Sequence, residues 1–156
     1  MKKRKSKPKL FKNATEELEF YWKVLIKAMA DFKSEISGGT DGLTAHHIAG
    51  KPCDALRYEL LNGVCCTSGE HKFGYHNTGR VEQYREITKK LRGEGVFEKL
   101  QEIKRDGSEG KAYYRAFLLA MLEPYKAEIE AYLAFKDYKS KKVKDQYNYL
   151  LEQLGG

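Results

Sequence analysis

The chain has 156 residues, of which 41% are hydrophobic, and a net charge of +7. This length predicts one domain, or a small domain with helical additions, and the apolar fraction suffices for a packed core. No apolar run approaches the ~20 residues of a membrane span. No apolar segment follows the basic N-terminus, as one does in a secretory signal. We therefore expect neither a membrane protein nor a secreted one.

Cysteine usage predicts a reducing compartment. The three cysteines are Cys53, Cys65 and Cys66, and they form no C-x-x-C pair. An odd number with two direct neighbours argues against a disulfide framework and against a cysteine-rich zinc site. We expect small, buried, reduced thiols and a cytoplasmic protein.

Most of the excess positive charge lies at the N-terminus. The stretch MKKRKSKPK carries six basic residues and no acidic one, and the rest of the chain has 23 basic against 22 acidic residues. We expect residues 1–12 to form a basic, flexible tail that is attracted to nucleic-acid phosphates. The alternative is that this basic tail only increases the solubility of the protein and binds no partner.

Residues 13–39 predict an N-terminal helix. Asn13 is placed to cap it, with Glu16 as the reciprocal partner, and Gly38 and Gly39 are placed to end it. Apolar residues recur at helical spacing and predict a face buried in the core. These residues are Leu18, Tyr21, Trp22, Leu25, Ile26, Met29 and Phe32.

The segment that follows is punctuated by turn residues and contains two short β-prone runs. The runs are LTAHHI and GVCCTS, and Asn62-Gly63 is a turn signal just before the second. GEHKFGYHN then predicts a short helix, which Gly74 weakens. The predicted order is strand, loop, strand, short helix.

The remainder predicts helices. RVEQYREITKKLRG and VFEKLQEIKRDG each carry apolar residues on one face. A longer helical stretch starts near Glu109, and Pro124 should kink or split it. KVKDQYNYLLEQL predicts a last helix. The expected fold class is therefore α+β and mostly helical.

All four histidines lie between residues 46 and 76, in the one segment that is not plainly helical. Neighbours on a strand point to opposite faces, so His46 and His47 should not both bind the same ion. Imidazole suits zinc and other first-row metals, and three imidazoles on one ion leave positions open for water and substrate. A fourth imidazole, with an ordinary pKa of about 6.5, suits a general base near neutral pH.

The stretch AHHIAGKP…LRYELLNGVCCTSGEHKFGYH resembles the HNH endonucleases of the His-Me finger (ββα-metal) superfamily, in the variants common in bacteriophages and prophages. The resemblance covers residues 40 to about 92. It implies a ββα-metal nuclease core at 40–92, between the helix at 13–39 and a C-terminal helical extension at 93–156. It also implies a metal-dependent DNA endonuclease or nickase in the cytoplasm of a bacterial or phage-infected cell.

The resemblance also implies a role for each site residue. His47 would be the general base that deprotonates the attacking water, and His46 and His71 would bind the metal. His76 would be a second metal ligand on the helix or a group that touches the phosphate. Asn62 would tie the loop and orient His47. The cofactor would be one divalent ion: Mg²⁺, Mn²⁺, Ni²⁺ or Zn²⁺.

The chain departs from the family pattern in the spacing of its last two histidines. Many relatives space them by four residues, but His71 and His76 are five apart. On an α-helix, five residues would turn the two side chains about 140° away from each other. Either the helix is irregular at Gly74, or His76 is not a direct metal ligand. The paired C-x-x-C knuckles of many relatives are also absent.

The expected DNA contacts are ionic. Lys51, Arg57, Lys72 and Arg80 flank the motif and could meet phosphates or remain solvated surface. No base-reading element is evident, so we expect weak sequence specificity.

Two alternatives to the nuclease function remain open. One is a non-catalytic nucleic-acid-binding protein with a structural or vestigial metal site. The other is a metal-free helical scaffold whose Tyr-rich helices bury a partner, such as a second copy or a phage protein.

Overall fold

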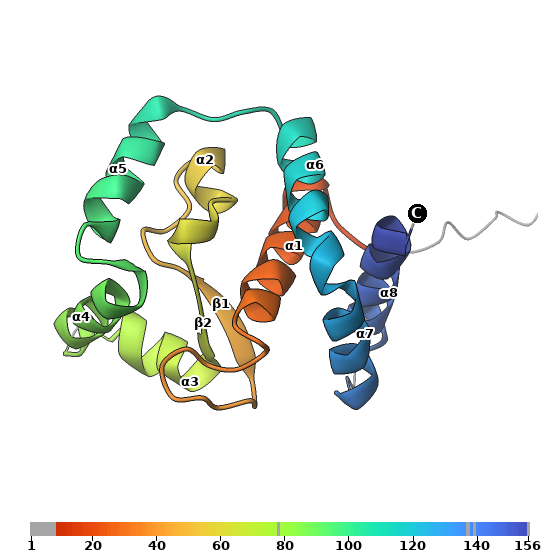
Figure 1. Ribbon diagram of the computed structural model, residues 1–156, viewed down its shortest axis with the longest axis horizontal. Coiled ribbons are helices and arrows are strands. Elements are labelled where there is room, and N and C mark those ends of the chain that lie inside the picture. The colour runs from red at the N-terminus through yellow and green to blue at the C-terminus, as the bar shows by residue number, and fades with distance from the viewer. Residues whose placement is uncertain (1–8, 78, 137, 139, 156) are drawn as a thin grey trace, which may run out of the picture.

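The computed structural model describes residues 9–77, 79–136, 138 and 140–155. In this part of the chain, helices flank one two-stranded antiparallel sheet (Figure 1), which confirms the α+β, mostly helical class. Residues 1–8 of the predicted basic tail lie outside the described residues. In chain order the elements are α1 (Ala14–Met29), β1 (Leu43–His47), α2 (Asp54–Arg57), η1 (Leu60–Asn62), β2 (Gly63–Thr67), α3 (Ser68–Glu70), η2 (His71–Tyr75), α4 (Val81–Arg92), α5 (Val96–Asp106), α6 (Lys111–Leu122), η3 (Glu123–Tyr125), α7 (Lys126–Phe135) and α8 (Lys141–Gly155).

The two predicted strands are confirmed, and they pair with each other. His46 lies opposite Val64 and His47 opposite Gly63. The predicted Asn-Gly turn is wrong, because Asn62 ends the short 3₁₀ helix η1 and Gly63 begins β2 with an extended backbone. The connection between the strands, which the sequence indicated only as a loop, contains α2 and η1.

A glycine at position 63 allows α1 to lie close against β2. A Cβ atom there would lie 2.4 Å from the side chain of Ile26 and 2.8 Å from the ring of Trp22. Heavy atoms cannot approach so closely, so any larger residue would push the helix away from the sheet. The close approach brings Trp22 next to His47 of β1.

The start of α1 follows the prediction in part. The side chain of Asn13 accepts a hydrogen bond from the backbone N–H of Glu16, as expected of an N-cap residue. The predicted return bond of the capping box, from the N–H of Asn13 to the Glu16 carboxylate, is not the one that forms. The Glu16 carboxylate accepts from the N–H of Lys12 instead.

The predicted end of this helix, at residue 39, is wrong, because α1 ends at Met29. Asp31 and Phe32 adopt positive φ angles of 54° and 52°, which break the helix well before Gly38. The reversal buries the ring of Phe32 against Tyr132 of α7, with the ring centroids 4.0 Å apart. Burial of one aromatic side chain therefore outweighs the local preference for helix.

The main hydrophobic core forms around α1. Helix α6 packs along one side of it and the sheet lies on the other (Figure 1). Pro124 splits the long predicted helix into α6 and α7 through the 3₁₀ turn η3, as expected. The largest fully buried side chains of this core are Trp22, Tyr21, Tyr58, Tyr147, Leu18, Leu25, Leu118, Leu122, Ile129 and Leu150.

Helix α5 packs mainly against α2 and η1, in the connection between the two strands. Its residues Val96 and Leu100 form a second buried cluster with Leu56 of α2. Figure 1 shows α4 and α5 beside α2 and β2, away from α7 and α8. The predicted division between 40–92 and 93–156 therefore separates α5 from the elements against which it packs.

The cysteines are reduced and mostly buried, as predicted. Burial raises the pKa of Cys65 to about 11 and that of Cys66 to about 12, so both thiols stay protonated at neutral pH. Within the described ranges, no helix has the length and apolar character needed to cross a membrane.

Candidate metal centre

The two neighbouring histidines of β1 point to opposite sides of the strand, as the alternation of side chains requires. His46 is 7% exposed and contacts the histidines of the segment after β2. His47 instead lies against α1, where its ring stacks on Trp22. One neighbour therefore joins a cluster of imidazoles and the other stands beside that cluster.

Three histidines come together around one point. The ring centroids of His46 and His71 lie 4.8 Å apart, those of His46 and His76 5.3 Å, and those of His71 and His76 4.6 Å. One ring nitrogen from each lies within 4.8 Å of the other two, which is an arrangement able to hold a metal ion. His46 is buried, His71 half-buried and His76 exposed, so the cluster opens to solvent on one side.

A π-helical turn resolves the five-residue spacing of the last two histidines. Residues His71–Tyr75 form η2, and the N–H of His76 bonds to the carbonyl of His71, five residues back. In a π-helix the backbone hydrogen bond joins residues five apart, so side chains five apart lie on nearly the same face. The Nε2 atoms of His71 and His76 lie 2.9 Å apart, within hydrogen-bond distance. The predicted irregularity near Gly74 is therefore present, and it places His76 beside His71.

Two aromatic contacts hold this turn in place. A Cβ atom at Gly74 would lie 2.2 Å from the ring of Tyr84 in α4, so only glycine allows α4 to pack so closely. The ring of Tyr75 stacks on His46, with the centroids 4.2 Å apart, and its hydroxyl hydrogen-bonds to Thr88 at 3.0 Å. Helix α4 therefore positions both the π turn and the buried imidazole.

The start of α3 is fixed by a capping box, which the sequence analysis did not identify. The Thr67 side chain accepts from the N–H of Glu70, and the Glu70 carboxylate accepts from the N–H of Thr67. Glu70 also accepts a hydrogen bond from the hydroxyl of Ser34 at 2.6 Å. The short helix that leads into His71 is thereby tied to the loop after α1.

The ring of His47 is held by two contacts. It stacks on Trp22 with the centroids 3.9 Å apart and the planes 7° from parallel. Its Nε2 lies 2.9 Å from the backbone carbonyl of Arg57. Because a carbonyl only accepts, this nitrogen carries the proton, and the lone pair of the neutral ring is on Nδ1. The indole N–H of Trp22 donates to the carbonyl of Glu59 at 3.0 Å, which fixes the stacking partner in turn.

Burial keeps the central imidazoles neutral. It lowers the pKa of His46 to about 3, with a further contribution from the positive charge that His71 and His76 carry when protonated. Burial lowers the pKa of His47 to about 4, although its hydrogen bond to Arg57 opposes the shift. The pKa of His71 is lowered for the same reason and by His76. A neutral imidazole has the free lone pair that metal binding and proton acceptance both require.

Asn62 ties the loop between the strands, as predicted, and does not point to the imidazole cluster. Its fully buried amide donates to the carbonyls of Gly50 and Leu56, both at 2.8 Å, and accepts from the N–H of Ala49 at 2.7 Å. It forms no hydrogen bond to the ring of His47. The connection between the strands that Asn62 ties also contains Arg57, whose backbone carbonyl bonds to Nε2 of His47.

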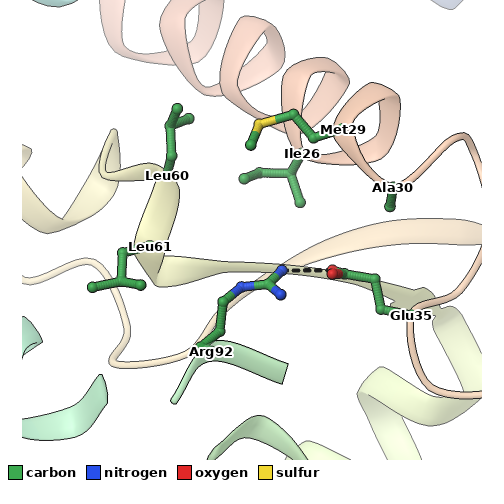
Figure 2. A pocket seen from close by; sticks show the side chains of 7 residues that line it. All are labelled: Ile26, Met29, Ala30, Glu35, Leu60, Leu61 and Arg92. Atoms are coloured by element: carbon green, nitrogen blue, oxygen red, sulfur yellow. Dashed lines mark hydrogen bonds and ion pairs between the residues drawn. The ribbon is translucent and has the colours of Figure 1, made fainter. Parts of the chain in front are cut away.

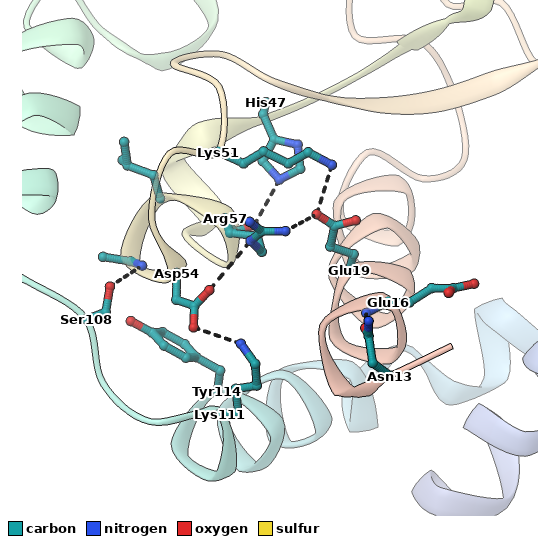
Figure 3. A network of polar contacts seen from close by, with 12 residues as sticks. Asn13, Glu16, Glu19, His47, Lys51, Asp54, Arg57, Ser108, Lys111 and Tyr114 are labelled. Atoms are coloured by element: carbon teal, nitrogen blue, oxygen red, sulfur yellow. Dashed lines mark hydrogen bonds and ion pairs between the residues drawn. The ribbon is translucent and has the colours of Figure 1, made fainter. Parts of the chain in front are cut away.

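The four basic residues predicted to contact DNA differ in their surroundings: two are paired with an acidic residue and two are exposed. Lys51 and Arg57 both bond to one oxygen of Glu19 at 2.9 Å, and Figure 3 shows this network beneath His47. Although burial acts in the opposite direction, Lys51 and Arg57 lower the pKa of Glu19. Lys72, which lies near the ring of Phe73, and Arg80 are exposed. Of the four, Lys51 alone lines the cavity at the histidines.

One basic residue at this cavity, Lys23, was not predicted from the sequence. Lys23 of α1 lines the same cavity of about 280 Å³ as Lys51 and all four histidines. It follows Trp22, whose helical spacing marked it only as a core residue. Being adjacent on the helix, Lys23 points about 100° away from Trp22 and reaches the rim of the site.

A larger cavity, of about 430 Å³, lies away from the histidines between α1, η1 and the end of α4 (Figure 2). Its apolar wall includes Ile26, Met29 and Leu60. The charged groups among the described residues that line it are Glu35 and Arg92, which bond to each other at 2.7 Å. These charges are paired and also bond to the backbone of β2, so they are not available for chemistry.

The chemistry of the donor set fits a first-row divalent metal. Three neutral imidazole nitrogens leave positions open for water and substrate. On a tetrahedral ion two such nitrogens stand about 3.3 Å apart. The Nε2 atoms of His71 and His76, 2.9 Å apart, are a few tenths of an ångström closer than this, whereas the three ligand nitrogens, with that of His46 included, lie within 4.8 Å of one another and would have to draw together around an ion. Comparison of the chain with protein-family models, with curated proteins and with solved structures found no match.

Proposed function

We propose that the protein is a metal-dependent endonuclease that hydrolyses phosphodiester bonds in DNA. The observation that carries this proposal is the separation of roles between two neighbouring histidines. His46 joins His71 and His76 in a cluster of neutral imidazoles, while His47 stands beside it with its ring fixed and Nδ1 free. The strand, loop, strand and short helix that carry these residues also agree with the HNH arrangement.

His46, His71 and His76 would hold the ion. When bound there, a divalent metal supplies Lewis-acid stabilisation for the charge that develops on the phosphate and on the leaving oxygen. The buried His46 sets the depth of the site, because Tyr75 fixes its ring. The exposed His76 lies on the side from which substrate enters.

His47 would act as the general base. Its Nδ1 accepts a proton from a water molecule, and the resulting hydroxide forms a bond to phosphorus while the bond to the 3′ oxygen breaks. The leaving 3′ oxygen takes a proton from solvent, so the product strands carry a 5′ phosphate and a 3′ hydroxyl. When the ring becomes positively charged, the Arg57 carbonyl on Nε2 and the carboxylate of Glu19 both favour the charged form.

Lys23 and Lys51 would bind the phosphates on either side of the scissile bond. Both line the cavity at the histidines, from α1 and from the loop after β1. Lysine acts as a point charge and reads no base, so binding should show weak sequence specificity. Affinity should fall steeply as salt rises, because each neutralised phosphate releases counterions.

A plasmid cleavage assay with Mg²⁺, Mn²⁺, Ni²⁺ and Zn²⁺ tests the proposal, in parallel with measurement of bound metal. His47→Ala should bind metal and DNA like the wild type and cut at least 100-fold more slowly, as expected for loss of a general base. His71→Ala should lose both metal binding and cleavage. Cleavage by His47→Ala at the wild-type rate would refute the assignment of the base. Gel-shift binding without cleavage by the wild type would favour the non-catalytic alternative.

A further inference from the structure

A second cavity borders the histidines on the side of α4 and α5. Its volume is about 260 Å³, and its walls include Ile48 after β1, Tyr75 of the π turn, and Val81 and Phe97 of the two helices. His46, His47, Gly50 and His76 line both this cavity and the basic one described above. A ligand whose charged group sits at the histidines can therefore extend a flat apolar group into the second cavity.

The composition of this cavity favours an aromatic ring system over an anion. Its only charged side chain outside the histidines is Arg85, whose guanidinium carbon lies 3.9 Å from the ring centroid of Phe97. At that distance the guanidinium lies against the face of the ring. Among the described residues, the guanidinium of Arg85 has no hydrogen bond or ion pair. A guanidinium held against an aromatic ring is a platform on which a base can stack.

The size of the cavity limits the ligand to one ring system. A volume of 260 Å³ is below the ~300 Å³ at which pockets for drug-sized ligands begin. One nucleobase fits such a space, whereas a base pair within a duplex does not. A base that enters it must leave the stack, and this costs least where the base is already unpaired.

We infer that this cavity is a nucleobase subsite, and that the protein prefers DNA with an unpaired base next to the cleaved phosphate. The inference rests on the proposed nuclease function, because the phosphate must sit at the histidines for the neighbouring base to reach Arg85 and Phe97. Bulges, flaps and single strands are the substrates of this class. The contact reads the presence of a base rather than its identity, since every base has a face that stacks.

Three duplexes of equal length test the inference: one fully paired, one with a single bulged nucleotide, and one with an abasic bulge. The abasic bulge has the same flexible backbone but lacks the base. Both cleavage rate and binding by fluorescence anisotropy are measured. The base-containing bulge should be cut and bound about tenfold better than the abasic bulge, the order of magnitude that one stacked base contributes.

Variants then locate the effect in the cavity. Arg85→Lys keeps the charge but loses the flat guanidinium, and Phe97→Leu keeps apolar volume but loses the ring. Each should reduce the preference for the base-containing bulge to about twofold, with little change on paired DNA. The matched control is Arg105→Lys, an exposed residue of α5 that lies about 12 Å along the helix from Phe97.

Each outcome separates the two proposals. Cleavage of all three duplexes at one rate, or full preference in Arg85→Lys, would overturn the subsite and leave the nuclease intact. Preferential binding of the base-containing bulge without cleavage would support the subsite and refute the nuclease. Neither cleavage nor preference would overturn both.

Discussion

The histidine region, from β1 to the π turn, and the helical layer α6–α8 are stabilised in different ways. The helical layer consists of regular helices whose buried residues are almost all apolar, such as Leu118, Leu122 and Ile129. The histidine region consists of strands and turns of three to five residues, joined by bonds from side chains to the backbone. Asn62 and His46 are buried there, although both are polar.

Because of this difference, the helical layer mainly determines the stability of the fold, and the histidine region determines the orientation of the site residues. In the helical layer the free energy of folding is spread over many apolar contacts, and a lost methyl group leaves the remaining positions nearly unchanged. In the histidine region one hydrogen bond or one stacked ring fixes the direction of a functional side chain. Substitutions in the two regions should therefore be distinguishable by their effect on the site, even where they cost the same stability.

The largest effect is expected from changing the length of the π turn. Deletion of the exposed Phe73 leaves His71 and His76 four residues apart, which an α-helical turn accommodates on one face. Insertion of an alanine after Phe73 makes the spacing six and turns the two rings apart. The deletion should keep metal affinity within about tenfold of the wild type, and the insertion should lower it at least 100-fold. Isothermal titration with Zn²⁺ measures both. Equal affinities for the two variants would contradict the role of His76.

The next prediction compares one residue from each region. Asn62→Ala leaves three backbone groups without their partner, of which the Leu56 carbonyl is buried, and should cost about 3 kcal/mol. Leu118→Ala should cost a similar amount, about 2–5 kcal/mol, by opening a cavity. Urea denaturation measures both. Assayed on folded protein at low temperature, the asparagine variant should cut DNA about 10–100-fold more slowly, whereas the leucine variant should keep the wild-type rate. Matching rates would remove the distinction between the regions.

A smaller effect is expected from the residue on which His47 stacks. Trp22→Phe keeps an aromatic face but loses the hydrogen bond to Glu59, and should cost about 1 kcal/mol. Because the ring of His47 is then less firmly held, cleavage at saturating metal should slow about tenfold. Metal affinity should not change. The control is Val24→Ala, which removes a buried group from the opposite face of α1. A slower rate in the control as well would show that general destabilisation is the cause.

The smallest effect concerns the basic rim. Lys23→Gln removes one predicted phosphate contact at the cavity. The slope of log affinity against log salt should become about one unit shallower, with a loss of affinity of only a few-fold. Lys33→Gln removes an equal charge from an exposed position outside this cavity and should leave the slope unchanged. Anisotropy titrations from low to high salt measure both slopes.

Features set by local geometry were predictable from the sequence. The divergence of His46 and His47 follows from the alternation of side chains on any strand, and the break at Pro124 follows from the missing N–H. The capping of α1 by Asn13 and the element order are of the same kind. The gathering of the four histidines in one region is also of this kind, because all four lie between residues 46 and 76 of the sequence.

Features set by long-range packing were not predictable. The π turn depends on the ring of Tyr84 lying over Gly74, a contact between two different elements. The early end of α1 depends on the burial of Phe32 against Tyr132, a hundred residues away in the chain. Hydrophobic periodicity showed that Trp22 is buried but not that it faces an imidazole. The positions that escaped prediction are therefore those whose conformation is decided by a distant partner.

The stacking of Trp22 on His47 also provides an optical signal. Trp22 is the one tryptophan of the chain, so tryptophan emission arises entirely beside His47, the proposed general base. An imidazolium ring quenches indole emission on contact more strongly than a neutral imidazole does. Intrinsic fluorescence should therefore follow the protonation of this one ring during turnover, with no label attached. The residue that positions the base thus makes the proposed proton transfer observable by stopped-flow spectroscopy.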